Sequence, residues 1–196
     1  MFLFGHLGIT LGLFFILGYL VPGIRGRINY WFVALGAVLP DIIDKLLGRV
    51  LFANSLASGR LIAHTLIFIL FLALVGLYLH RRSRDARMLL VSGASLLHLL
   101  EDHMWAQPVT FLWPLLGWSF PRGAASDDWI DYFLVTIRNS YTPDFSYVFI
   151  SEIIGFTIIT LLLAYLFSRT KADHQQSHRP ASALISLHIK EHRKQK

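Results

Sequence analysis

The chain has 196 residues, of which 55% are hydrophobic and only 15% are charged. A typical soluble domain has about 25% charged residues, so this composition excludes a disordered chain and disfavours an ordinary soluble domain. The net charge is +6, but basic residues gathered on one side of a membrane explain such an excess, so we expect no nucleic-acid partner. The chain has no cysteine, so any metal site must use His, Asp, Glu or water.

Four segments approach or reach the length of about 20 apolar residues that crosses a bilayer as a helix. They are residues 1–21, 61–79, 88–104 and 147–167. A fifth segment, residues 28–47, is apolar in its first half and is then interrupted by Pro40, Asp41 and Asp44, so we expect a helix whose far end is polar or broken. The sequence therefore predicts an all-α, multi-pass transmembrane helical bundle of about five spans.

The first segment is predicted to be a retained helix rather than a cleaved signal peptide. It has no basic residue before its apolar run and no clear cleavage site of small residues. Gly8 and Gly12 are four residues apart, a spacing that suits close packing between helices in lipid.

A long segment that does not span the membrane, residues 105–145, separates the last two spans. It is rich in tryptophan, which is typical of chain that lies at the level of the lipid headgroups. Ser126, followed by Asp127 and Asp128, is a plausible helix start, because serine caps helices and acids favour the first turn. Apolar residues follow at helical spacing, at Ile130, Phe133, Leu134 and Ile137. We therefore expect an interfacial helix here.

The composition becomes polar and basic after residue 168. The sequence thus predicts a transmembrane domain over residues 1–168 and a disordered basic tail over residues 169–196. With five spans, 13 of the 18 basic residues fall on the side of the tail. Since basic loops face the cytoplasm, we expect an inner-membrane protein with a cytoplasmic C-terminus and an external N-terminus.

The external ends of the first four predicted helices all carry ionisable side chains. In chain order these are His6, Asp41, Asp44, His64, His98, Glu101, Asp102 and His103. His98 and Asp102 are four residues apart and share a helix face, whereas His103 points away from it. Ionisable groups in spanning segments cost several kcal/mol unless they are paired or solvated, so this set indicates a functional site.

Neutral imidazoles with carboxylates and without thiols suit zinc first, with manganese or iron as alternatives. The expected metal ligands, for one ion or two, are His6, Asp41, His64, His98 and Asp102. A metal there would lower the pKa of bound water toward about 7 and polarise a phosphoryl or carbonyl oxygen. Asp44 and Glu101 are candidate general bases. Arg60, four residues before His64 on the same expected helix face, is a candidate for binding an anionic substrate group.

Four motifs carry a resemblance to a known family. They are Leu39–Lys45, Gly59-Arg60 with Ala63-His64-Thr65, His98–Asp102 and Phe111–Leu115. Over about residues 5–121, their order and spacing resemble the YdjM-like family of inner-membrane-associated, metal-dependent hydrolases. The resemblance implies a multi-pass membrane hydrolase whose polar site contains His6, Asp41, Asp44, His64, His98 and Asp102.

The chain departs from the family pattern at two positions. Gly59 stands where many relatives have a histidine, and Asp44 follows Asp41 by three residues rather than two, so the number of metal ions stays open. The pair of His98 and Asp102 also resembles half of the zinc site in phospholipases C and related nucleases, which favours phosphodiester substrates.

The leading hypothesis is hydrolysis of a phosphoester-containing lipid or lipid-linked substrate at the outer membrane–water interface. The alternative is a non-enzymatic metal-binding or transport protein that uses the same cluster. A third reading is a scaffold with a degenerate site. The cytoplasmic halves of the predicted spans carry no comparable polar set, which argues against an ion path. The expected partners are the bilayer and a small-molecule or lipid substrate, and the oligomeric state stays open.

Overall fold

The structure is a computed structural model and describes residues 1–53, 55–122 and 129–177. All regular secondary structure in these ranges is helical, which confirms the predicted all-α class. The chain divides into two compact units, residues 1–159 and 160–196. The packing described below lies within the first unit, and the described residues of the second continue the last helix.

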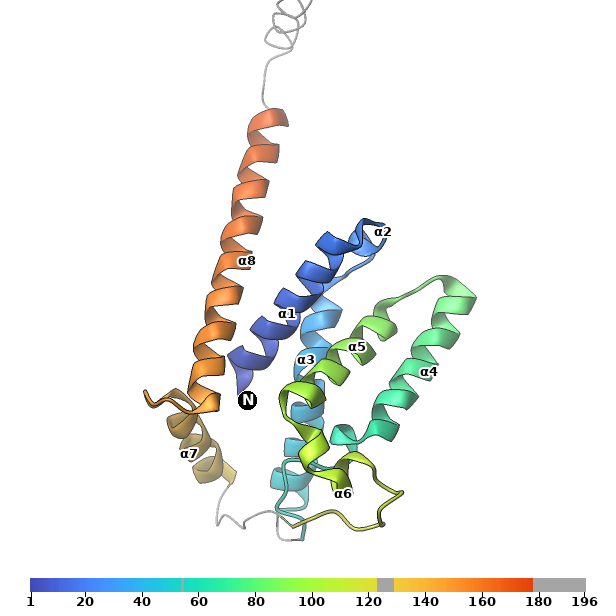
Figure 1. The fold of residues 1–196 in the computed structure, drawn as a ribbon, viewed down its shortest axis with the longest axis vertical. Coiled ribbons are helices and arrows are strands. Elements are labelled where there is room, and N and C mark those ends of the chain that lie inside the picture. Colours follow the sequence, from blue (N-terminus) through green and yellow to red (C-terminus); the bar gives the residue numbers. More distant parts are fainter. Residues whose placement is uncertain (54, 123–128, 178–196) are drawn as a thin grey trace, which may run out of the picture. The chain divides into compact units, whose positions relative to one another are not determined.

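The helices follow the predicted order along the chain (Figure 1). The elements are α1 (Leu3–Leu20), α2 (Pro22–Arg25), α3 (Tyr30–Lys45), the π-helical turn η1 (Leu46–Leu51), the 3-10 turn η2 (Ile62–His64), α4 (Leu66–Ser83), α5 (Arg87–Glu101), the 3-10 turn η3 (Met104–Ala106), α6 (Pro108–Phe111), α7 (Trp129–Tyr141) and α8 (Tyr147–Ser177).

Three segments of the described chain are long and apolar enough to cross a membrane: α1, α4 and residues Tyr147–Lys171 of α8. On α4, the large apolar side chains of Leu70, Phe71 and Leu74 are exposed, as expected for a helix that faces lipid. By contrast, α3 and α5 have only 16 and 15 residues. The structure therefore supports three of the five predicted spans, and the other two remain a prediction.

An extensive contact in the first unit joins α3 to α5. Val33 of α3 and Ala94 of α5 are fully buried and form a core cluster with Phe14 of α1. Gly36 lies against the backbone of α5, where a side chain would overlap Val91. Small residues at this contact let the two backbones approach closely, which is how helices associate where lipid replaces water.

Pro40 lies inside α3 without ending it. Because proline has no N–H, the carbonyl of Gly36 loses its partner within the helix. The hydroxyl of Ser95 on α5 donates a hydrogen bond to that carbonyl over 2.9 Å. The proline that interrupts the sequence pattern thus creates a polar link between α3 and α5, and α3 continues to Lys45.

A glycine contact joins α1 to the first half of α8. Gly8 lies against the backbone of Gly155, and a Cβ atom on either glycine would overlap the other helix. The methyl groups of Ile158 lie beside Gly12, one turn along α1. The prediction of close packing at Gly8 and Gly12 is therefore confirmed.

The third predicted span begins later than expected, at Leu66 rather than near residue 61. The hydroxyl of Thr65 accepts a hydrogen bond from the amide of Phe68 and caps α4, while residues 61–64 form a separate turn. Arg60 precedes this turn and is not helical. The expectation that Arg60 and His64 share a helix face is therefore wrong.

Helix α7 forms where the interfacial helix is predicted, but its expected cap, residues 126–128, lies outside the described residues. Its location at a membrane surface remains a prediction. Helix α8 continues to Ser177, ten residues beyond the expected end of the last span at Phe167.

Candidate metal centre

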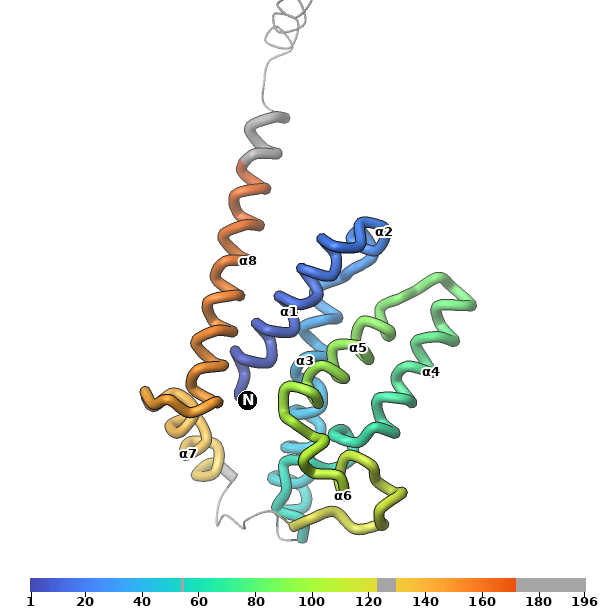
Figure 2. The backbone as a smooth tube through the Cα atoms, viewed as in Figure 1, coloured from blue at the N-terminus to red at the C-terminus, as the bar shows by residue number. Residues whose placement is uncertain are grey.

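Four helix ends meet in the first unit: the start of α1, the end of α3, the turn before α4, and the end of α5 (Figure 2). They bring together every predicted site residue, namely His6, Asp41, Asp44, Arg60, His64, His98, Glu101 and Asp102. Each of these side chains lies within 4 Å of at least one other member of the set. Residues from four separate stretches of sequence thus form one polar cluster.

Asp44 and His64 are both fully buried and form the deepest part of the cluster. The Asp44 carboxylate accepts hydrogen bonds from the amides of Leu61, Ala63 and His64 over 2.5–3.1 Å. It also lies 2.8 Å from Nδ1 of His64. Four donors converge on this carboxylate, so it fixes the turn before α4 and orients the His64 ring, with its Nε2 turned away from Asp44.

His98 is held in the same manner by a backbone group. Its Nδ1 lies 2.7 Å from the carbonyl oxygen of Ala37. A carbonyl only accepts, so Nδ1 of His98 carries the proton and Nε2 of the neutral ring presents a lone pair. That Nε2 lies 3.4 Å from Nε2 of His64.

The facing Nε2 atoms form an unfavourable contact unless a cation or proton lies between them. With Nδ1 of His64 donating to Asp44, both Nε2 atoms are acceptors in the neutral rings. Tetrahedral zinc with Zn–N bonds of about 2.0–2.1 Å separates two ligand nitrogens by about 3.3–3.4 Å. The observed separation therefore fits two histidine ligands of one ion.

Asp41 completes a group of three with these histidines. Its Oδ1 lies 3.7 Å from Nε2 of His64 and 3.9 Å from Nε2 of His98. Its Oδ2 is paired with Lys45 at 2.7 Å. The Asp41 side chain is 19% exposed, whereas both histidine side chains are fully buried, so Asp41 marks the open side of the centre.

His6 belongs to a second group, with His98 and Asp102. Its Nδ1 lies 2.8 Å from Oε2 of Glu101, whose Oε1 accepts a hydrogen bond from Thr10. Its Nε2 has no hydrogen-bond partner in the described chain and lies 3.3 Å from Oδ1 of Asp102. The His6 ring stacks on His98, with ring centroids 3.9 Å apart. Glu101 thus orients His6 as Asp44 orients His64.

Asp102 joins the two groups to the basic side of the cluster. Its Oδ2 accepts two hydrogen bonds from Arg60, over 3.1 Å from Nε and 2.7 Å from a terminal nitrogen. Its Oδ1 lies 2.8 Å from the amino group of Met1. Arg60 therefore reaches the site from a loop, although not from the helix face that the spacing suggested.

The residues present fit a divalent cation. The two groups share His98 and offer, in all, three imidazole nitrogens and two carboxylates, from His6, His64, His98, Asp41 and Asp102. Each histidine is oriented through Nδ1 by an oxygen atom, the arrangement typical of metal-ligating histidines. The cluster therefore has both the ligand chemistry and the supporting contacts of a metal centre.

His103 lies outside the cluster, as its spacing predicts. Its ring contacts Trp105 and Tyr147, with centroids 4.9 and 5.0 Å away.

Glu152 is a buried acid that sequence reasoning left without a role. Its carboxylate, only 2% exposed, accepts hydrogen bonds from the amides of Phe2, Phe4 and Gly5 and from the hydroxyl of Tyr141. The first amides of a helix have no partner within it, so Glu152 of α8 caps α1 immediately before His6. Burial and the Glu152 charge raise the pKa of Tyr141, which keeps that hydroxyl a donor. The sequence signal that could have identified Glu152 is that it is a single charged residue in an otherwise apolar span.

Two hollows meet at the centre and share Phe2, Asp41 and Lys45. The apolar hollow, of about 420 Å³, is lined by His6 and by apolar side chains of α1, α3 and α7, among them Ile42, Phe133 and Ile137. The basic hollow, of about 460 Å³, contains Asp41, Asp102 and four cationic side chains: Lys45, Arg49, Arg60 and Arg122.

A family profile described as YdjM inner membrane protein matches residues 1–175. The match includes every residue of the cluster. No curated protein and no solved structure matches the chain.

Proposed function

The chain belongs to the YdjM inner membrane protein family, and we propose that it is a membrane-bound, metal-dependent hydrolase of phosphoester-containing lipids or lipid-linked substrates. The family and the apolar helices support a membrane location. The reaction, the substrate class and the metal are the proposal.

The observation that carries this proposal is the contact between the Nε2 atoms of His64 and His98. These two nitrogen atoms lie 3.4 Å apart in a buried site with their lone pairs facing each other, which favours a bound cation. We assign the ion to His64, His98 and Asp41, with His6 and Asp102 as the further ligands. The set suits zinc, with manganese or iron as alternatives. When bound, such an ion supplies Lewis-acid polarisation of a phosphoryl oxygen and makes water more acidic.

The two hollows support an amphiphilic, anionic substrate. Guanidinium and ammonium groups in the basic hollow can neutralise a phosphate. The apolar hollow provides room for a hydrocarbon chain, and Asp41 lies where the two meet. A phosphoester whose headgroup occupies the first hollow and whose chain occupies the second would place its phosphorus beside the centre.

The contacts of the two candidate bases favour positioning roles. Asp44 receives four hydrogen bonds and Glu101 receives two, so neither has an oxygen free of donors. Proton transfer is better assigned to Lys45 and to Oδ2 of Asp41, the oxygen that faces Lys45, whereas Oδ1 faces the two histidines. In this assignment water attacks phosphorus and gives up a proton to Oδ2 of Asp41, the P–O ester bond breaks, and Lys45 protonates the departing alkoxide.

The test combines metal analysis with an activity assay on the purified full chain. Protein in detergent is loaded with zinc, and phosphate release is measured from phosphatidic acid in mixed micelles. We expect His98→Ala to lose both zinc and activity, whereas His103→Ala, a control on a neighbouring histidine, keeps both. Lys45→Gln should keep the metal and lose activity by about 10²–10⁴-fold, as expected for a lost general acid.

Two outcomes would contradict the proposal in different ways. Zinc that binds equally well to the His98→Ala protein would remove the metal centre. Zinc that depends on His98 without hydrolysis of any phosphoester lipid would favour the non-enzymatic metal-binding or transport protein instead.

A further inference from the structure

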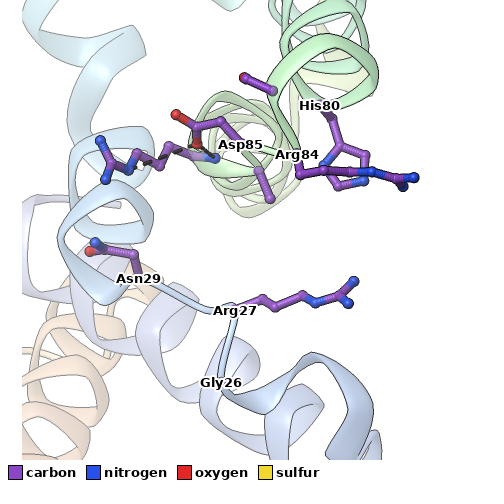
Figure 3. A pocket seen from close by; sticks show the side chains of 9 residues that line it. Gly26, Arg27, Asn29, His80, Arg84 and Asp85 are labelled. Atoms are coloured by element: carbon purple, nitrogen blue, oxygen red, sulfur yellow. Dashed lines mark hydrogen bonds and ion pairs between the residues drawn. The ribbon is translucent and has the colours of Figure 1, made fainter.

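A third hollow, drawn in Figure 3, is lined by residues at the end of α4 and the start of α5. The metal centre lies at the opposite ends of these two helices. The third hollow has a volume of about 750 Å³ and is formed where the loop before α3 faces the loop between α4 and α5. We call it the distal hollow. Its polar lining includes Arg27, Asn29, His80, Arg84, Asp85 and Arg87.

The charge of the distal hollow is strongly positive. Three arginines face a single acid, Asp85, whose Oδ1 accepts a hydrogen bond from the Arg87 amide and lies 3.8 Å from the Arg87 side chain. The guanidinium groups of Arg27 and Arg84 form no hydrogen bond or ion pair with the described part of the chain. Figure 3 shows these two side chains extending toward the same side from the two facing loops. The hollow therefore offers two arginines to an anion.

The backbone at Arg84 adds to this argument. Arg84 ends α4 in the left-handed conformation, with φ 58°. Glycine is the residue that this helix-ending position normally favours, because a side chain disfavours positive φ. An arginine at this position is thus not explained by the helix end alone, whereas a role for its guanidinium group explains it.

Exposed aromatic residues place the distal hollow at the level of lipid headgroups. Trp31 on the first turn of α3, Tyr19 near the end of α1 and Tyr78 near the end of α4 are 84%, 70% and 60% exposed. All three lie at the helix ends that border the hollow. Exposed Trp and Tyr at one end of apolar helices are typical of the membrane–water interface.

We propose that the distal hollow binds the phosphate headgroup of an anionic membrane lipid through Arg27 and Arg84. Basic pockets between the ends of membrane helices bind anionic headgroups in this way. The site is separate from the metal centre, so it holds whether or not the proposed hydrolysis occurs. It also does not depend on which side of the membrane this end faces.

Native mass spectrometry of the full chain in detergent tests this site with phosphatidylglycerol and, for comparison, phosphatidylcholine. We expect the wild-type protein to retain phosphatidylglycerol preferentially. The double variant Arg27→Gln/Arg84→Gln should bind it about tenfold more weakly or worse. The matched control Arg81→Gln/Arg82→Gln removes the same charge from exposed positions of α4 that do not line the hollow, and it should bind as wild type does.

Arg84→Gly serves as a second variant because glycine suits the positive φ and preserves the helix end. It should also weaken lipid binding, with unchanged thermal stability. Equal losses in the double variant and its control would show a diffuse effect of charge and overturn the site. Binding of inorganic phosphate that depends on Arg27 and Arg84, without any preference for phosphatidylglycerol, would show a site for soluble anions and overturn the lipid assignment.

Discussion

The carboxylate of Asp44 holds His64 at two points, through the amide nitrogen at 3.1 Å and through ring Nδ1 at 2.8 Å. This double contact fixes both the backbone and the ring of one histidine. It therefore favours a role for Asp44 in positioning His64, a proposed metal ligand, and this role predicts the effect of substituting Asp44.

Asp44→Asn should weaken metal binding and stability together. An amide NH2 group would face donors that now meet a carboxylate oxygen, so we expect a loss of about 1–3 kcal/mol in the free energy of unfolding. Metal affinity should fall by about 10–100-fold, as for other residues that orient metal ligands. Zinc titration and denaturation in detergent measure both quantities, with the exposed Asp131→Asn as control. If activity fell while zinc affinity stayed at the wild-type value, Asp44 would be the general base after all.

Glu152→Gln should destabilise the contact of α8 with α1 and α7. The glutamine keeps the shape, but its NH2 group replaces one of the two carboxylate oxygens. That oxygen accepts hydrogen bonds either from Phe4 and Tyr141 or from Phe2 and Gly5. We expect a loss of about 1–3 kcal/mol. Tyr141→Phe should cost about 0.5–1.5 kcal/mol alone and much less in a Glu152→Ala background, where no side-chain acceptor remains for the hydroxyl. Additive losses in this double-mutant cycle would argue against a direct Tyr141–Glu152 hydrogen bond.

Gly8→Ala should separate α1 from α8, because the new methyl group overlaps the backbone of Gly155. Overpacking of this kind typically costs about 1–3 kcal/mol. Gly23→Ala is the matched control, since nothing lies within 4 Å of a Cβ atom built there. Unfolding in a detergent titration compares the two variants. The close helix contact would be refuted by a Gly8→Ala protein as stable as the Gly23→Ala protein.

The orientation in the membrane is open to direct measurement, because the chain has no cysteine of its own. We expect Ser177→Cys to be protected from an impermeant thiol reagent in intact cells and Ser126→Cys to be labelled. The basis is the gathering of 13 of the 18 basic residues on the side of the tail. Labelling of Ser177→Cys from outside would reverse the orientation and place the metal centre on the cytoplasmic face.

The meeting of the site residues could be predicted from sequence because their polar side chains lie at helix ends. If alternating helices place the starts of α1 and α4 and the ends of α3 and α5 on one side, then His6, Asp41, His64 and His98 lie at the same level and can meet there. The helical class followed from apolar segments that approach or reach the length needed to cross a bilayer as a helix.

The contacts of individual residues could not be predicted, because they depend on backbone groups that no periodicity reveals. The sequence suggested Asp44 as a general base, but in the structure its carboxylate accepts hydrogen bonds from three amides of residues 61–64. Glu152 was visible as a charge in an apolar span, but its partners are the free amides at the start of another helix. Thr65, a residue type that caps helices, indicated the late start of α4, but the apolar residues on both sides of it favoured a longer helix.

Pro40 has a consequence for the register of α3 against α5. The carbonyls of Gly36 and Ala37 accept hydrogen bonds from Ser95 and His98, two side chains one turn apart on α5. Sliding one helix along the other by a turn would break both bonds and leave the buried side chains of Ser95 and His98 without these partners. The depth of His98 is therefore set by the backbone of α3 before any ion arrives. Metal binding should require little ordering of these two helices, and the empty and loaded centres should have nearly the same spacing between them.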